Sequence, residues 1–318
     1  MRTCARALSI WIAFSVLAVA SSASAVAMLF SPVGGAGNAA DTTGFGAVGY
    51  DYSVGTYEVT NAQYTEFLNA KAASDPLGLY NVFMGATSQG GITRTGVSGS
   101  FTYTTIAGRQ DKPVDFVSFY DALRFTNWIA NGQGTGDTET GSYTLLGGTA
   151  IPANGLTLTR NAGAVYGVTS ENEWYKAAFY DVGSGTYFDY PTSSNVITGC
   201  AAPTATANRA NCNNAAGGIP VVVGAYTGSA GPNGTFDQGG NVWEWNESIL
   251  FTAFRGIRGG AYGSLASKLA ATDQESSTPA LEFADVGFRL TYIPEPGTGL
   301  LMALGLVGMA ARKRSQTR

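Results

Sequence analysis

The side chains that could do chemistry in this chain are mainly carboxylates, because the sequence contains no histidine. This absence excludes Ser-His-Asp and Cys-His catalysis, His-ligated zinc and the iron site built from two histidines and one carboxylate. Four carboxylates lie at or near predicted helix starts: Asp115, Asp121, Glu171 and Glu173. Asp121 follows Ser118 by three residues and Glu173 follows Ser170 by three, which is the spacing of a capping box. No pair has a spacing that demands acid–base chemistry.

A second candidate is the segment Gly239-Gly240-Asn241-Val242-Trp243-Glu244-Trp245. Two large aromatic residues flank one glutamate, so the carboxylate is expected to be buried and to need a cation or a partner. Arg258 and Arg289 could each supply the partner. The predicted aromatic core comprises Trp174, Trp243, Trp245, Tyr262 and Phe288.

The N-terminus has the pattern of a secretory signal peptide. Arg2 and Arg6 precede an apolar run over 7–20, and the small residues of 23–25 form a cleavage site. The predicted signal peptide is therefore 1–25, with a cut after Ala27 as the alternative. The mature domain is expected outside the cytoplasmic membrane.

The C-terminus carries Pro294-Glu295-Pro296, an apolar run over 297–311 and a basic cluster over 312–314. The run has about 15 residues, short for a bilayer core that needs roughly 20, and the basic cluster would stay cytoplasmic. This order resembles the PEP-CTERM sorting signal of exported proteins in Gram-negative bacteria. The resemblance implies transient membrane anchoring, cleavage by an exosortase and release to the cell surface or extracellular matrix. An ordinary anchor helix is the alternative.

Cysteine use agrees with export. Cys4 belongs to the predicted signal peptide, and Cys200 and Cys212 remain as an even pair in an oxidising compartment. A disulfide closing this short loop would stabilise the fold by about 3 kcal/mol. A reactive or metal-binding thiol pair is the alternative.

The composition limits the classes of ligand. Between residues 26 and 293, 12 Lys+Arg and 21 Asp+Glu remain, so the net charge is about −9. A sparse acidic surface excludes nucleic acid as a partner and is compatible with divalent cations and neutral polysaccharide. The chain has 43 glycines and only 13% charged residues, which indicates many turns and irregular loops.

Hydrophobic spacing and capping residues predict three modest helices. The first begins after Thr60 or Asn61, the second runs from Ser118 to about Ala130, and the third runs from Ser170 to about 181–183. Strands are predicted at 54–59 and 100–106, with a hairpin-like, turn-rich stretch over 132–165. No linker divides the mature chain into two domains.

Six segments in fixed order resemble the formylglycine-generating enzyme, or sulfatase-modifying factor, family. They are YEVTNAQYTEFLN at 57–69, PVDFVSFYDALRFTNW at 113–128, VTSENEWYKAA at 168–178, GGNVWEW at 239–245, RGIRGGAY at 255–262 and VGFRL at 286–290. The resemblance implies a C-type-lectin-like α+β fold with little regular secondary structure. The implied organisation is a signal peptide (1–25), a lead-in segment (26–49), the family domain (50–292) and the sorting tail (293–318).

The resemblance also implies structural calcium. Its ligands would be Asp237, Glu244 and the carbonyl oxygens of Gly240 and Val242, which are the hard oxygen donors that Ca²⁺ takes. A second calcium would lie near Asn208 and the carbonyl of Arg209, completed by Asn213 or Asn214.

The family's copper chemistry is not expected here. It needs two cysteines after the RGGxY-like segment, and the corresponding positions are Ser264 and Leu269. Cys200 and Cys212 lie on a different segment. Copper and formylglycine formation are therefore improbable.

The function expected from these features is binding of glycan, such as exopolysaccharide, or of a surface protein, without catalysis. Exposed tyrosines could stack on sugar rings, and the candidates are Tyr50, Tyr52, Tyr80, Tyr103, Tyr143 and Tyr187. One alternative is a diverged oxidase or other modifying enzyme with a relocated site. Another is a matrix component with no discrete ligand.

Overall fold

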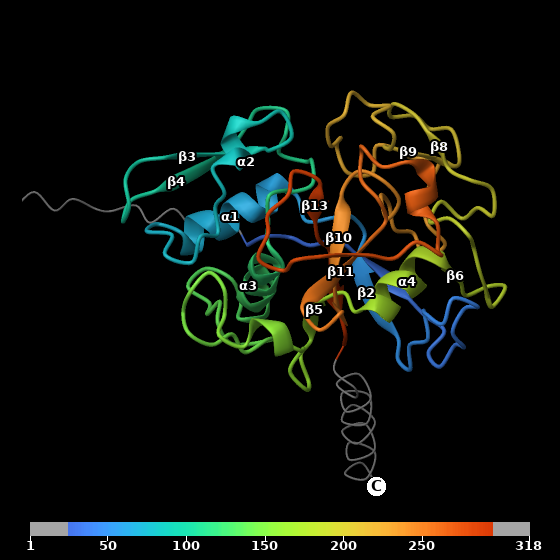
Figure 1. Cartoon of the computed structure of the whole chain (residues 1–318), viewed down its shortest axis with the longest axis horizontal. Helices are drawn as coiled ribbons and strands as arrows, with labels where there is room; N and C mark the ends of the chain where they lie inside the picture. The colour runs from blue at the N-terminus through green and yellow to red at the C-terminus, as the bar shows by residue number, and fades with distance from the viewer. Residues whose placement is uncertain (1–24, 295–318) are drawn as a thin grey trace, which may run out of the picture.

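Three helices begin at capping boxes in the computed structural model, which describes residues 25–294 (Figure 1). They are α1 (Asn61–Lys71), α3 (Phe119–Ala130) and α4 (Glu171–Phe179). The N-cap side chains are those of Thr60, Ser118 and Ser170, and each accepts from the backbone N–H three residues later. The three predicted helix starts are confirmed. They could be predicted because a capping box depends only on local sequence.

The helix ends and one further helix differ from the prediction. α4 ends at Phe179, because the next two residues form β6 (Tyr180–Asp181) and pair with β7 (Thr186–Tyr187). A short helix, α2 (Phe83–Ala86), was not predicted, and its N-cap makes no side-chain hydrogen bond. A sequence without a cap or a periodic apolar face carries little helix signal.

Two four-stranded sheets form the centre, in the orders β1-β2-β14-β5 and β12-β11-β10-β13. The first contains β1 (Phe30–Val33), β2 (Tyr52–Gly55), β14 (Leu290–Tyr292) and β5 (Tyr166–Val168). The second contains β12 (Glu275–Ser277), β11 (Phe254–Arg258), β10 (Trp243–Leu250) and β13 (Val286–Gly287). Two-stranded pairs join β3 (Ile92–Thr95) to β4 (Thr102–Thr105) and β8 (Gly199–Cys200) to β9 (Arg209–Ala210).

Both ends of the described chain are built into the first sheet. β14 lies between β2 and β5, and β1 pairs with β2 over Phe30–Val33. The lead-in segment therefore contributes a strand, and the chain leaves the fold directly from an inner strand at Tyr292.

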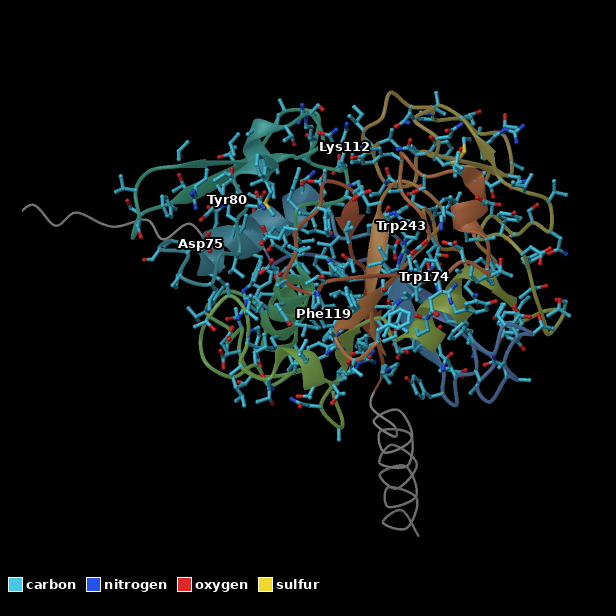
Figure 2. The ribbon with its side chains drawn as sticks, viewed as in Figure 1. Asp75, Tyr80, Lys112, Phe119, Trp174 and Trp243 are labelled. Carbon is cyan, nitrogen blue, oxygen red and sulfur yellow. A yellow bond between two sulfur atoms is a disulfide. The ribbon has the colours of Figure 1, made fainter. Side chains whose placement is uncertain are left out.

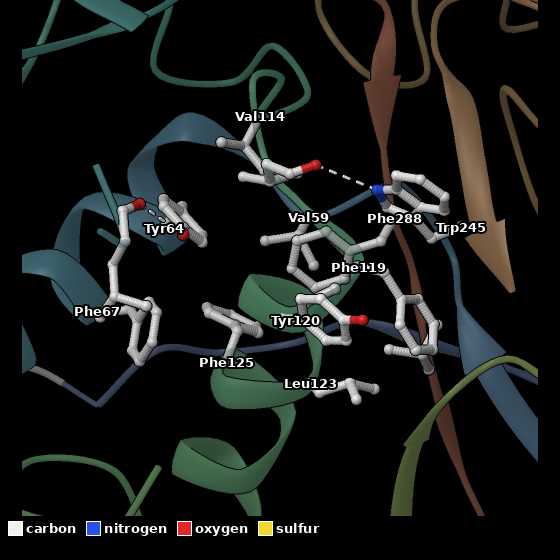
Figure 3. Packing of buried hydrophobic residues seen from close by; sticks show 14 of the residues in the cluster. Val59, Tyr64, Phe67, Val114, Phe119, Tyr120, Leu123, Phe125, Trp245 and Phe288 are labelled. Carbon is white, nitrogen blue, oxygen red and sulfur yellow. Dashed lines mark hydrogen bonds between the residues drawn. The ribbon is translucent and has the colours of Figure 1, made fainter. Parts of the chain in front are cut away.

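Aromatic side chains from distant segments make the main core. Phe67 of α1 packs against Phe125 and Trp128 of α3 with ring centroids 5.5 and 5.4 Å apart, and Phe288 lies 5.5 Å from Phe125. Figure 3 shows Tyr64, Phe67 and Phe125 facing one another between the two helices. All five aromatic residues predicted for the core are buried.

One strand prediction and one loop prediction need correction. The strand predicted at 54–59 is β2 at Tyr52–Gly55, because the chain then turns toward the cap of α1. The stretch 132–165 is turn-rich but forms no hairpin, and its one regular element is the 3-10 helix η1 (Gly155–Thr157). Side-chain amides hold its backbone instead: Asn131 donates to the carbonyls of Asp137 and Thr140.

Within residues 25–294, no helix is both long and apolar enough to cross a bilayer. The anchor expected at 297–311 and nearly all of the expected signal peptide lie outside the described residues, as do Glu295 and Pro296 of the sorting motif.

Candidate functional site

Glu244 is the centre of a fully buried ion pair. Its two carboxylate oxygens accept from Nη2 and Nε of Arg289, both at 2.5 Å, and one also accepts from Nε1 of Trp174 at 2.6 Å. Arg289 donates further to the carbonyls of Gly55 and Phe236. Figure 2 shows Trp174 and Trp243 near the middle of the molecule. This pair joins α4, β10 and β2, so Glu244 is satisfied by protein groups alone.

The other arginine has a different partner. Arg258 donates through Nε to Glu171 at 2.6 Å and through Nη1 to the carbonyl of Ala271. Of the two arginines that could pair with Glu244, Arg289 is therefore the one that does.

Beside this pair lies a second buried glutamate with an unsatisfied oxygen. Glu58 is 1% exposed; one oxygen accepts from Nδ2 of Asn241 at 3.1 Å, and Oε2 has no hydrogen-bond partner. Burial, followed by the charge of Asp237, raises the pKa of Glu58 well above its ordinary value. Since leaving a buried carboxylate oxygen unpaired is costly, Oε2 is suited to bind a proton or a cation.

Asp237 approaches the same region from a strained turn. Its backbone is left-handed (φ 60°), and one carboxylate oxygen accepts from the N–H of Gly224 at 2.5 Å. Burial raises the pKa of Asp237 to about 6, against the lowering effects of the Gly224 N–H and Arg289. Asn241, also left-handed (φ 62°), fixes the turn by accepting from the N–H of Val221 at 2.9 Å.

The residues in this region suit calcium in type. Asp237 and Glu58 offer carboxylate oxygens, and the expected carbonyl donors Gly240 and Val242 belong to the turn between Asp237 and Glu244. No three His, Cys, Asp or Glu side chains within residues 25–294 are grouped so as to hold an ion by themselves. Backbone carbonyls would therefore have to complete the coordination. Glu58 was not among the predicted ligands, although it lies in a predicted strand next to a helix cap.

A cavity of about 630 Å³ opens elsewhere, at the end of the first sheet. Its lining includes Tyr50, Arg160, Asn161 and Glu247, together with Ile293 and Pro294 where the chain leaves the fold. Arg160 is held by carboxylates on two sides: it donates to both oxygens of Glu173 at 2.9 and 2.7 Å and to both oxygens of Glu247 at 2.9 Å. We call this the Tyr50 cavity.

The charged groups at the Tyr50 cavity form a network around Arg160. Although burial alone would raise it, the guanidinium of Arg160 and its hydrogen bonds lower the pKa of Glu173. Burial raises the pKa of Glu247 despite the same guanidinium. Tyr50 is 42% exposed and donates its hydroxyl to Glu173 at 2.7 Å, which fixes its ring at the cavity wall.

A family model described as the sulfatase-modifying factor enzyme 1-like domain matches residues 46–292, and a PEP-CTERM protein-sorting motif matches 293–315. The chain belongs to the sulfatase-modifying factor enzyme 1-like family. Among solved structures, Treponema denticola variable protein 1 is 18% identical with a TM-score of 0.54, covering 86% of this chain and 98% of that one. CarF is 20% identical with a TM-score of 0.56, covering 84% and 98%. At this identity these structures show the shared fold. No curated protein sequence matches the chain.

The sorting motif indicates where this protein is sent. A PEP-CTERM motif indicates export and cell-surface sorting in a Gram-negative bacterium, with processing by an exosortase, which is a membrane protein. The predicted family, fold class and sorting signal are confirmed.

The positions where the family resemblance implies copper-binding cysteines are occupied differently in this member. Leu269 is 1% exposed and packs with Ala210 and Cys212, and the hydroxyl of Ser264 accepts from the N–H of Ala261 at 2.9 Å. Cys200 and Cys212 form the predicted disulfide, the yellow bond beside β8 and β9 in Figure 2. Although the cysteines come from another segment, the bridge lies against Leu269. No free thiol is left among the described residues.

The residues of the predicted second calcium site form hydrogen bonds to other protein groups. The amide oxygen of Asn208 accepts from the hydroxyl of Thr192 at 2.7 Å, and its Nδ2 donates to the carbonyls of Val196 and Ile197. The backbone N–H of Arg209 donates to the hydroxyl of Ser229. Asn213 and Asn214 instead donate their backbone N–H groups to Ser264 and Tyr262.

The four carboxylates considered for catalysis do not form one site. Asp121 and Glu173 act in capping boxes, as predicted, and Glu171 pairs with Arg258. Asp115 is fully buried, and neither of its carboxylate oxygens has a partner. Burial raises the pKa of Asp115 well above its ordinary value, which favours the neutral acid.

Of the six tyrosines named as candidates to stack on sugar, four are buried, which removes those four from the candidates. Their hydroxyls bond inside the fold: Tyr52 to the carbonyl of Glu173, Tyr80 to that of Ile92, Tyr103 to that of Ala72 and Tyr143 to the carboxylate of Glu247. Tyr187 is partly buried and donates to the carbonyl of Ala39. Tyr50 alone of the six is exposed.

Proposed function

We propose that this exported domain is a non-catalytic module that binds a neutral glycan in the Tyr50 cavity. The observation that supports the proposal is the combination of one exposed aromatic ring with a fixed set of planar polar groups in an open cavity of about 630 Å³. A cavity of this size suits a small ligand or a few sugar units.

The chemistry of the lining favours hydroxyl-rich ligands. The apolar face of a sugar ring packs on an aromatic ring, while Arg160, Glu247 and Asn161 offer donors and acceptors in fixed positions. Glu173 and Glu247 carry two negative charges against the one positive charge of Arg160. This excess disfavours an acidic polysaccharide and leaves a neutral glycan as the preferred class.

Calcium has a structural role in this proposal. Glu58 and Asp237, with carbonyls of the turn that leads to Glu244, would hold the ion, and the unpartnered Oε2 of Glu58 supports its presence. The ion would neutralise the buried carboxylates and fix the turn at Asn241. Glu244 would contribute through its pair with Arg289, because both of its oxygens already accept hydrogen bonds.

The test is a binding measurement with defined probes. The purified mature protein would be applied to an array of neutral and acidic oligosaccharides and to the exopolysaccharide of the producing strain. We expect binding to neutral glycans, with loss in Tyr50→Ala and retention in Tyr50→Phe, which keeps the ring. Val82→Ala, at an exposed apolar residue outside the cavity, is the control. Absence of binding to every polymer, or equal binding by Tyr50→Ala, would overturn the proposal.

A further inference from the structure

Exposed apolar side chains gather on the turn that joins β10 to β11. Phe251 is 80% exposed, and Ile249 and Phe254 are 41% and 38% exposed. The rings of Phe251 and Phe254 meet edge to face with centroids 6.5 Å apart. Phe251 and the next residue, Thr252, both have left-handed backbones (φ 50° and 65°), where a glycine or an asparagine is usual. The turn thus presents an aromatic residue to solvent at a conformational cost.

A fourth exposed apolar residue belongs to η1, which contacts β11. Arg255, at the start of β11, donates through Nη2 to the carbonyl of Leu158 at 2.7 Å and to that of Gly155 at 3.3 Å. These bonds bring η1 against β11, and Leu156 of η1 is 52% exposed. We call Leu156, Ile249, Phe251 and Phe254 the exit patch.

The exit patch lies on the side where the chain leaves the fold. Glu247 of β10 lines the same cavity as Ile293 and Pro294, and it precedes Ile249 by two residues. In Figure 1, β10 and β11 run down to the lower side, where the red end of the described chain is also found. The patch and the point of exit therefore share one face.

The sequence beyond that point limits how far this face can be from a membrane. Only four residues, 293–296, separate β14 from the apolar run that begins at Gly297, and four residues span at most roughly 14 Å. The polar layer of a bilayer is about 5–8 Å thick on each side. The run of roughly 15 residues is also short for a hydrocarbon core of about 30 Å. Insertion of the run into the bilayer therefore draws the attached domain toward the membrane surface.

We propose that the exit patch docks on the lipid surface while the sorting tail is attached. Phe, Leu and Ile side chains at the tip of a turn can enter the boundary between headgroups and acyl chains. This contact would orient the domain with the sorting motif between itself and the membrane. The inference depends on the sorting tail and is independent of the glycan proposal.

The test compares two exposed positions in the mature chain that retains its tail. Phe251→Cys and Val97→Cys would each carry a nitroxide label, because Cys200 and Cys212 are joined and the introduced cysteine is the only free thiol. Val97 is 71% exposed on the turn between β3 and β4, away from the exit face. Each protein would be reconstituted in phosphatidylcholine vesicles, and collision of the label with oxygen and with a soluble nickel chelate on both sides would be measured.

We expect a higher ratio of oxygen to nickel collision at position 251 than at position 97. The difference should disappear when the same proteins are in detergent micelles, which are too small to contain a bilayer patch. Equal ratios in vesicles would overturn the proposal. Dipolar broadening of the position 251 label that vanishes on dilution with unlabelled chain would place a second copy on the patch, and would also overturn it.

Discussion

Glu244 and Glu58 are both buried glutamates in the same part of the molecule, and the fold treats them in opposite ways. Glu244 accepts from Arg289 and Trp174, so every charge is matched by a protein donor. Glu58 has one bond to Asn241 and an oxygen with no partner. A satisfied carboxylate is part of the architecture, whereas an unsatisfied one can accept a proton or, as we propose for Glu58, a cation. Substitution by glutamine should therefore have different consequences at the two positions.

The largest effect is expected for Glu244→Gln. Removing the carboxylate leaves Arg289 buried without a counter-charge, which costs about 3–5 kcal/mol. Urea unfolding should show this loss in the free energy of unfolding with an unchanged slope. Glu66→Gln, at an exposed position of α1, is the control and should change stability by less than about 0.5 kcal/mol. Equal stability of the two variants would contradict the architectural role of Glu244.

The sequence predicts helix starts and the burial of Glu244, but not which arginine pairs with Glu244. Capping boxes at Ser118 and Ser170 depend on residues three apart, so the starts of α3 and α4 could be predicted. The buried glutamate between two tryptophans could be predicted from its flanking residues, but the choice of Arg289 over Arg258 could not. That choice depends on the parallel pairing of β10 with β13, which no local pattern specifies.

Long-range features were missed for the same reason. Glu58 and Asp237 are far apart in the sequence, and only the closed fold brings their charges together. The sequence could not show which of the six candidate tyrosines are exposed, because Tyr52 and Tyr103 are buried through bonds to backbone carbonyls of distant segments. The Tyr50 cavity, formed by segments around residues 50, 160, 247 and 293, had no sequence signal.

The disulfide lies next to the hydrogen bonds that position Glu58. Asn211, next to Cys212, donates to the amide oxygen of Asn241, and the Nδ2 of Asn241 donates to Glu58. The double variant Cys200→Ser/Cys212→Ser should lose about 3 kcal/mol, because the short loop is no longer closed in the unfolded chain. Urea unfolding measures the loss. A reducing agent should bring the wild-type protein to the same value and leave the double variant unchanged; the opposite pattern would contradict a structural bridge.

Calcium removal should separate the two glutamates most clearly. Calcium at about a hundredfold excess over its dissociation constant should stabilise the wild type by about 2.7 kcal/mol, measured as a thermal shift against a chelator. In Glu58→Gln the shift should disappear. Without calcium this variant should be as stable as the wild type or more so, since an amide carries no buried charge. A calcium shift of equal size in both proteins would remove Glu58 from the site, and magnesium is the control ion.

Glu282 offers a third way to satisfy a partly buried carboxylate, which is to bind a proton. Burial, then the charge of Asp121, raises its pKa to about 7 from an ordinary value of 4.5. The folded protein therefore holds this proton more tightly than the unfolded chain, so its contribution to stability is complete below pH 4.5 and is lost as the pH rises through 7. After allowance for partial solvent screening, the loss between pH 5 and pH 8 should be about 1–2 kcal/mol. Glu282→Gln should flatten this part of the curve of unfolding free energy against pH, whereas Glu66→Gln should follow the wild type. An unchanged slope in Glu282→Gln would show that protonation does not satisfy this carboxylate. Glu282 would then not be an example intermediate between the paired Glu244 and the unpartnered Glu58.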